Sequence, residues 1–170
     1  TVDDFTPTSL LKAVNEMNEG VDYKGSKLTT PTSYCTGASI DIEHDIETEI
    51  NLTHRKIQSG AQYFLLQGIF DPQPIKMFYD LYASKFNNEL SIPVFCGVQI
   101  MAPGSMVFGE VPERITRDLE RGKTGPEIAL ELIHKLVETG VNSFYLIPPI
   151  LKAGRRDYEA AQQVIHSFKT

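Results

Sequence analysis

Apolar residues recur along the chain at two spacings, which predict helices alternating with short buried strands. Helical spacing bounded by Gly and Pro predicts helices over about Ser9–Asn18, Ile42–Ser59, Asp71–Phe86, Pro112–Arg121, Pro126–Thr139 and Tyr158–Phe168. Wholly apolar runs predict strands at Tyr34–Ala38, Tyr63–Leu66, Val94–Val98 and Phe144–Ile147. Strands without polar alternation are typical of a parallel sheet covered on both faces. The pattern therefore predicts an α/β fold.

The helix expected over Ile42–Ser59 carries the clearest buried stripe. Its members step by four, four, three and four residues, at Ile42, Ile46, Ile50, Thr53 and Ile57. Acidic residues crowd the first half of this helix, and Arg55 and Lys56 stand in its last turns. This distribution complements the helix dipole, and we expect Gly60 to end the helix.

Two segments of the chain are similar to each other. Ile57–Leu66 and Val137–Leu146 each pass from a helix end through a hydroxyl residue and a Gly into a buried strand. Such a repeat fits a fold built from units of a strand followed by a helix. A complete (β/α)8 TIM-type barrel needs eight strands and about 250 residues, whereas four strands are expected here. The chain is therefore either half of such a barrel or a small open-sheet domain of flavodoxin type.

Composition narrows the class of protein. With 170 residues, 41% hydrophobic and 22% charged, residues 1–170 suit a single globular domain and exclude disorder, collagen and coiled coil. The net charge of −6 offers no basic surface for nucleic acid, and no apolar run approaches the roughly 20 residues of a membrane helix. Cys35 and Cys96 lie in apolar runs and are expected to be buried, reduced thiols of a cytoplasmic protein. No signal peptide is visible, and the start at Thr1 suggests a piece of a longer chain.

Ligands of either architecture bind at the carboxyl ends of the strands. Gln67 and Gln99 stand at two consecutive ends and are expected to point into one mouth. A glutamine side chain both donates and accepts hydrogen bonds, which suits the amide edge of a flavin or pterin. The alternative for such a glutamine is a hydrogen bond to a neighbouring loop.

Other candidate residues are weaker. Arg55 and Lys56 are either a phosphate clamp or the dipole-complementing residues of a helix end. Asp41, His44 and Asp45 could hold a metal ion, but acids gather at helix starts for dipole reasons and no second His cluster joins them, so no metal is predicted. The chain contains neither GxGxxG nor GxxxxGK[ST], which excludes a Rossmann dinucleotide loop and a P-loop.

Several motifs, in order along the chain, resemble methylenetetrahydrofolate reductase. The match includes the acidic helix that ends in Arg55-Lys56, and its ending is closest to the variant fused to homocysteine methyltransferases. The matching segments are Thr36–Ala38, Ser59–Ala61, Gln67, Phe70-Asp71, Ile92–Val94, Gly97, Gly125–Ala129, Gly140-Val141 and Leu146–Pro149.

The resemblance implies the C-terminal half of a flavin-containing (β/α)8 barrel. That family uses NAD(P)H to convert 5,10-methylenetetrahydrofolate to 5-methyltetrahydrofolate, with hydride passing through FAD. By the resemblance, Gln67 contacts the folate pterin, Arg55 and Lys56 contact the FAD phosphates, Glu49 lies near the same cofactor, and His44 belongs to the flavin loop. The family's catalytic acid lies in the N-terminal half, so no catalytic residue is assigned here.

Three functions follow from these observations. The chain is part of a flavin-dependent folate reductase, a non-catalytic half-barrel scaffold, or a flavin-free barrel that binds a folate-like molecule. Ser39 and Leu52 stand where the family has a flavin-contacting Tyr and an Asn, which leaves the flavin-free alternative open. Because four parallel strands leave two open edges, we expect a homo-oligomer or a partner that supplies the other half barrel.

Overall fold

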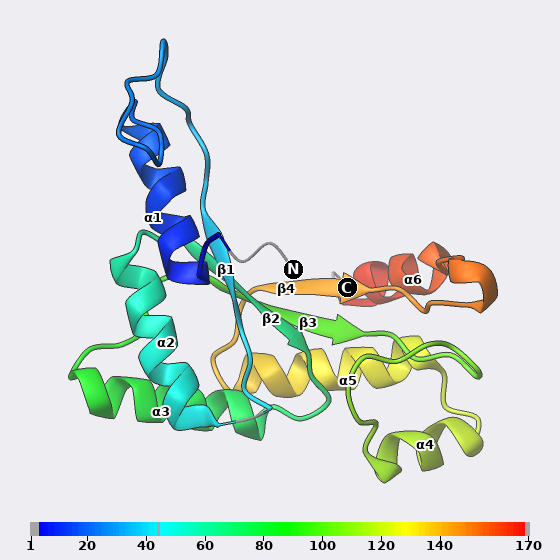
Figure 1. The fold of residues 1–170 in the computed structure, drawn as a ribbon. Helices are drawn as coiled ribbons and strands as arrows, with labels where there is room; N and C mark the ends of the chain where they lie inside the picture. The colour runs from blue at the N-terminus through cyan, green and yellow to red at the C-terminus, as the bar shows by residue number, and fades with distance from the viewer. Residues whose placement is uncertain (1–3, 44, 169–170) are drawn as a thin grey trace. The chain divides into compact units, whose positions relative to one another are not determined.

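The computed structural model describes residues 4–43 and 45–168 as an α/β chain (Figure 1). Its helices are α1 (Pro7–Asn18), α2 (Ile46–Gln58), α3 (Gln73–Phe86), α4 (Glu113–Glu120), α5 (Gly125–Glu138) and α6 (Tyr158–Phe168), with a 3-10 turn at Lys152–Gly154. Its strands are β1 (Gly37–Ile40), β2 (Tyr63–Gly68), β3 (Val94–Gln99) and β4 (Phe144–Ile147). The strands form one parallel sheet in the order β1-β2-β3-β4, which confirms the predicted α/β class and the parallel order. Among the helices described, none has the length and apolar character to span a bilayer.

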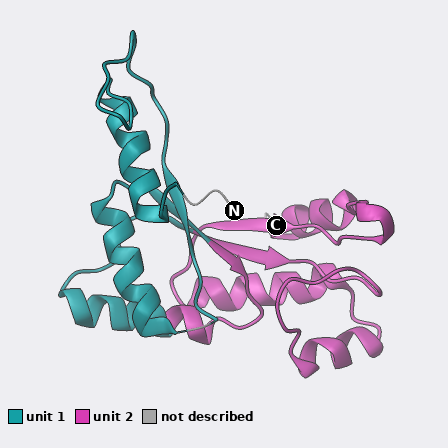
Figure 2. Cartoon of the chain, viewed as in Figure 1, with its two compact units in different colours: residues 1–65, 77–94 teal, residues 66–76, 95–170 magenta. Residues whose placement is uncertain are grey.

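The sheet lies in a chain that divides into two compact units, shown in Figure 2. Unit 1 holds residues 1–65 and 77–94, and unit 2 holds residues 66–76 and 95–170. Compact units that share a sheet can belong to one domain, so the single domain over residues 1–170 stays a prediction.

The predicted bounds of strand β1, Tyr34–Ala38, are wrong at both ends. It begins at Gly37 rather than Tyr34, because side chains bind the backbone N–H groups of the preceding residues. Asn18 Oδ1 accepts from the N–H of Tyr34 at 2.9 Å, and Gln62 Oε1 accepts from that of Thr36 at 2.9 Å. Cys35 lies in this segment and is exposed, so the prediction that its thiol is buried is also wrong.

Helix α2 begins four residues later than its apolar stripe predicts. Asp45 caps the helix, and its carboxylate accepts from the N–H of Glu47 at 3.1 Å. Hydrogen bonds to Thr48 and to the backbone of Thr48 and Glu47 hold the pKa of Asp45 below its usual value. The stripe itself is confirmed at its centre, where Ile50 and Thr53 are fully buried in unit 1.

The predicted repeat is confirmed as one helix-ending turn used twice. After α2, the N–H groups of Gly60 and Ala61 donate to carbonyls three and five residues earlier, at 2.9 and 3.0 Å. After α5, Gly140 and Val141 make the same two bonds at 2.9 and 3.1 Å. This pattern is a Schellman motif, and both glycines take the left-handed backbone it requires, with φ of +95° and +92°.

In unit 2, a tyrosine crosses the sheet over a glycine. Gly97 on β3 is the register partner of Tyr145 on β4. A Cβ atom on Gly97 would lie 2.7 Å from the Tyr145 hydroxyl, so only glycine leaves room for the ring to cross β3. The hydroxyl then donates to the Leu66 carbonyl on β2 at 2.9 Å. Burial is the main cause that raises the pKa of Tyr145, and an electrostatic interaction with Cys96 adds to it. The hydroxyl therefore stays protonated and remains a hydrogen-bond donor.

Candidate functional site

The two predicted substrate glutamines lie at strand ends of unit 2 in different environments. Gln99 is only 2% exposed, and its amide is bonded to the loop that follows β3. Its Nε2 donates to the Met106 carbonyl at 2.8 Å, and its Oε1 accepts from the N–H of Phe108 at 3.0 Å. Gln67 is exposed, and its side-chain amide makes no hydrogen bond with any residue that the structure describes. Gln99 therefore positions a loop, whereas Gln67 offers a free amide.

Strand β2 presents its exposed residues on alternate positions. Phe64, Leu66 and Gly68 are buried, while Leu65 is 42% exposed and Gln67 is exposed. A wholly apolar run predicts cover on both faces, but one face of this strand is open. Gln67 thus stands at the carboxyl end of an open strand face, where ligands of parallel α/β sheets bind.

The loops that follow β3 and β4 are tied to each other within unit 2. The N–H of Met106 donates to the Ile150 carbonyl at 2.8 Å, and Ile150 also forms an antiparallel bridge with Arg156. Because Gln99 holds the same loop at Met106, these bonds fix the carboxyl-end surface of unit 2.

In unit 1, two of the predicted cofactor residues form a buried ion pair. Lys56 is 4% exposed and Glu49 8% exposed, and Lys56 Nζ lies 3.0 Å from Glu49 Oε1. The same ammonium donates to the Ser39 carbonyl near the carboxyl end of β1 at 2.6 Å. Thr53 completes the cluster with a long bond of 3.5 Å from its hydroxyl to Glu49 Oε1. The pair therefore ties α2 to β1.

Arg55 and His44 are the other two residues predicted to bind the cofactor. Arg55 is exposed and forms no ion pair with the residues in the described ranges, so its guanidinium is accessible. His44 lies outside the described residues. Lys56 also lines a cavity of about 560 Å³ in unit 1, whose other walls come from α1 and the segment from Tyr34 to Ser39.

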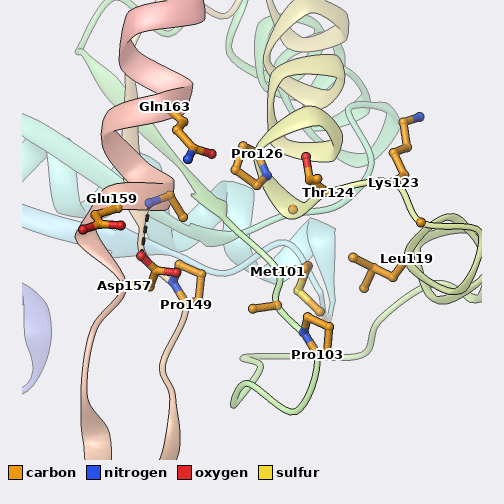
Figure 3. Close-up of a pocket in the computed structure, with 14 residues that line it drawn as sticks. Met101, Pro103, Leu119, Lys123, Thr124, Pro126, Pro149, Asp157, Glu159 and Gln163 are labelled. Carbon is orange, nitrogen blue, oxygen red and sulfur yellow. Dashed lines mark hydrogen bonds between the residues drawn. The ribbon is translucent and has the colours of Figure 1, made fainter.

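A second cavity, of about 390 Å³, lies in unit 2 (Figure 3). Its walls come from the loop after β3, the end of α4 with the loop that follows it, the start of α5, the loop after β4 and the start of α6. The lining includes Met101, Leu119, Pro126, Pro149, Asp157 and Gln163. The sequence indicated the two strand-end loops, but the contributions of α5 and α6 were missed. The Gly125-Pro126 pair at the start of α5 was the sequence feature that could have indicated the contribution of this helix.

Metal binding and thiol chemistry have little support in the described ranges. No group of three or more His, Cys, Asp or Glu side chains there is arranged to hold a metal ion. Cys96 is buried as predicted, and burial raises the pKa of its thiol to about 12. This thiol is therefore neutral and a poor nucleophile near neutral pH.

Comparison with known proteins shows what the chain resembles. No family model matches the chain, and no curated protein matches it. Among solved structures, it is similar to an uncharacterized protein from Clostridium thermocellum, described as binding two copies of 5-methyl-5,6,7,8-tetrahydrofolic acid. The TM-score is 0.55 at 18% identity, and the match covers 79% of this chain and 54% of that one, so this chain spans about half the length of its neighbour. The likeness shows that the two proteins share a fold.

Proposed function

We propose that this chain binds a reduced folate and forms the C-terminal half of a barrel like that of methylenetetrahydrofolate reductase. The observation that carries the proposal is the exposed, unbonded amide of Gln67 at the carboxyl end of β2. The pterin ring of a folate has an edge of alternating donors and acceptors, which a glutamine amide can pair with. The folate-binding neighbour of the same fold and the motif resemblance support this choice of ligand.

We expect Gln67→Ala to weaken binding of 5-methyltetrahydrofolate about tenfold, as measured by titration calorimetry. The loss of a hydrogen-bonding pair costs roughly 1–3 kcal/mol, and about 1.4 kcal/mol corresponds to a tenfold change in affinity. Gln162→Ala is the matched control, because Gln162 is an exposed glutamine on α6 that does not line either cavity described above. Unchanged affinity in Gln67→Ala would contradict the role of Gln67.

The half-barrel proposal rests on the open surfaces of the sheet. β1 and β4 are the first and last strands in the sheet order, and Leu65 is exposed on one face of β2. Edge strands and exposed apolar side chains favour association. We therefore expect a homo-oligomer or a complex with a chain that supplies the other strands, and a monomer that persists on dilution in light scattering would contradict this.

The finer proposal is a flavin-dependent reductase that produces 5-methyltetrahydrofolate from 5,10-methylenetetrahydrofolate with NAD(P)H. FAD would supply the hydride-carrying ring, and the residues of this chain would hold its phosphates. Arg55 fits that role because its guanidinium is exposed and unpaired among the described residues. Lys56 fits it less well, since its ammonium already binds Glu49 and the Ser39 carbonyl.

Flavin binding separates this proposal from its alternatives. We expect the chain to retain flavin absorbance after incubation with FAD and gel filtration, and Arg55→Ala to reduce the retained flavin. Arg117→Ala on α4, which removes another exposed arginine, is the control. Folate binding without flavin retention would favour the flavin-free barrel, and binding of neither would favour the scaffold.

A further inference from the structure

We propose that the cavity between the starts of α5 and α6 is a second pterin-binding site, separate from Gln67. The proposal rests on the proposed folate binding and adds a site that the family resemblance does not assign. Gln67 does not line this cavity. Its volume of about 390 Å³ lies within the range of roughly 300–1,000 Å³ that small-molecule pockets occupy. A bicyclic pterin ring fits such a space.

One carboxylate supplies the acceptors that a pterin edge needs. Asp157 precedes α6, and its Oδ1 accepts from the N–H of Ala160 at 3.2 Å. Its other oxygen accepts no hydrogen bond from any residue in the described ranges. A carboxylate has about four lone-pair sites, so Asp157 can also accept from the ring N–H and the 2-amino group of a 2-amino-4-oxopyrimidine.

Gln163 on α6 supplies a hydrogen-bond donor that complements the Asp157 carboxylate. Figure 3 shows the Gln163 amide directed toward Pro126, and the Asp157 carboxylate beside Pro149. The side-chain amide of Gln163 has no hydrogen bond with the part of the chain that the structure describes. Its NH2 group can donate to the ring 4-oxo group while Asp157 accepts from the adjacent donors.

The remaining walls suit the faces of a flat ring. Met101 is 6% exposed, and Leu119, Pro126 and Pro149 add apolar surface around it. Methionine adapts its shape to irregular ligands, and the proline rings offer rigid C–H surfaces. The cavity thus combines apolar walls with a carboxylate and an amide from one side, which is the general pattern of a small-molecule site.

Asp157→Asn tests the carboxylate while retaining the fold. Asparagine is as good a helix N-cap as aspartate, so α6 keeps its cap. The variant loses the charge and one acceptor, and we expect binding at this site to weaken about tenfold. Glu138→Gln is the matched control, because Glu138 is an exposed carboxylate at the end of α5 that does not line the cavity. Gln163→Leu tests the amide independently.

Equilibrium dialysis with 5-methyltetrahydrofolate gives the number of folates bound per chain. We expect two, of which Gln67→Ala weakens one about tenfold and Asp157→Asn weakens the other about tenfold. A single bound folate whose affinity falls in Gln67→Ala and is unchanged in Asp157→Asn would overturn the second site and leave the proposed function intact. Absence of folate binding in the unaltered chain would overturn both.

The 2-amino-4-oxopyrimidine edge occurs in guanine as well as in pterins. Competition with guanosine and with pterin therefore identifies the ring. Displacement of the Asp157-dependent folate by pterin, but not by guanosine, supports the proposal. Stronger displacement by guanosine, or equal weakening in Asp157→Asn and Glu138→Gln, would overturn it.

Discussion

Gly125→Ala is expected to destabilise the chain by about 3 kcal/mol or more. Gly125 is the first residue of α5, and a Cβ atom there would lie 1.7 Å from the Met101 carbonyl oxygen and 2.8 Å from its carbon. Both of these are backbone atoms, so no side-chain rotation can relieve the overlap. The helix would have to move away from the loop after β3, and the free energy of unfolding in urea measures the cost.

Gly104→Ala is the control for this substitution. Gly104 has nothing within 4 Å of the position that a Cβ would occupy, but its φ is +72°. The expected cost is therefore only that of a left-handed backbone, about 1–2 kcal/mol. If both substitutions cost the same, the close approach between Gly125 and Met101 would not limit stability.

Local patterns predicted most of the fold because the elements are regular. The strand at Phe144–Ile147 and the helix at Tyr158–Phe168 have the predicted bounds, since apolar periodicity alone determines them. The start of β1 was not predictable in this way. Its register depends on Asn18 and Gln62, whose side chains bind backbone groups distant in the sequence.

The candidate sites show the same limit. Gln67 and Gln99 both end apolar strands and look equivalent in sequence, but only the loop geometry shows that Gln99 is bonded to Met106 and Phe108. The cavity in unit 2 is lined by three segments that are far apart in the sequence, around residues 101, 125 and 160. A local sequence pattern cannot show that these segments meet. The ion pair between Glu49 and Lys56 spans seven residues of one helix, so both residues were found, but their burial was not foreseen.

Lys56→Met is expected to destabilise the chain by about 3–5 kcal/mol, because it leaves the Glu49 carboxylate buried without its counter-charge. The Ser39 carbonyl loses its donor in the same step, which releases the carboxyl end of β1 from α2. Methionine has a similar length to lysine, so cavity formation contributes little. Urea unfolding measures the loss.

Two further variants separate the charge effect from a general loss of packing. Lys85→Met removes the lysine of an exposed pair with Glu47, at 3.2 Å, and is expected to cost less than about 1 kcal/mol. The double variant Lys56→Met/Glu49→Met removes both buried charges and is expected to recover much of the stability, because a buried pair and an apolar replacement are often similar in stability. If the double variant were no more stable than Lys56→Met, the unpaired carboxylate would not be the cause, and the lost bond to Ser39 would account for the instability.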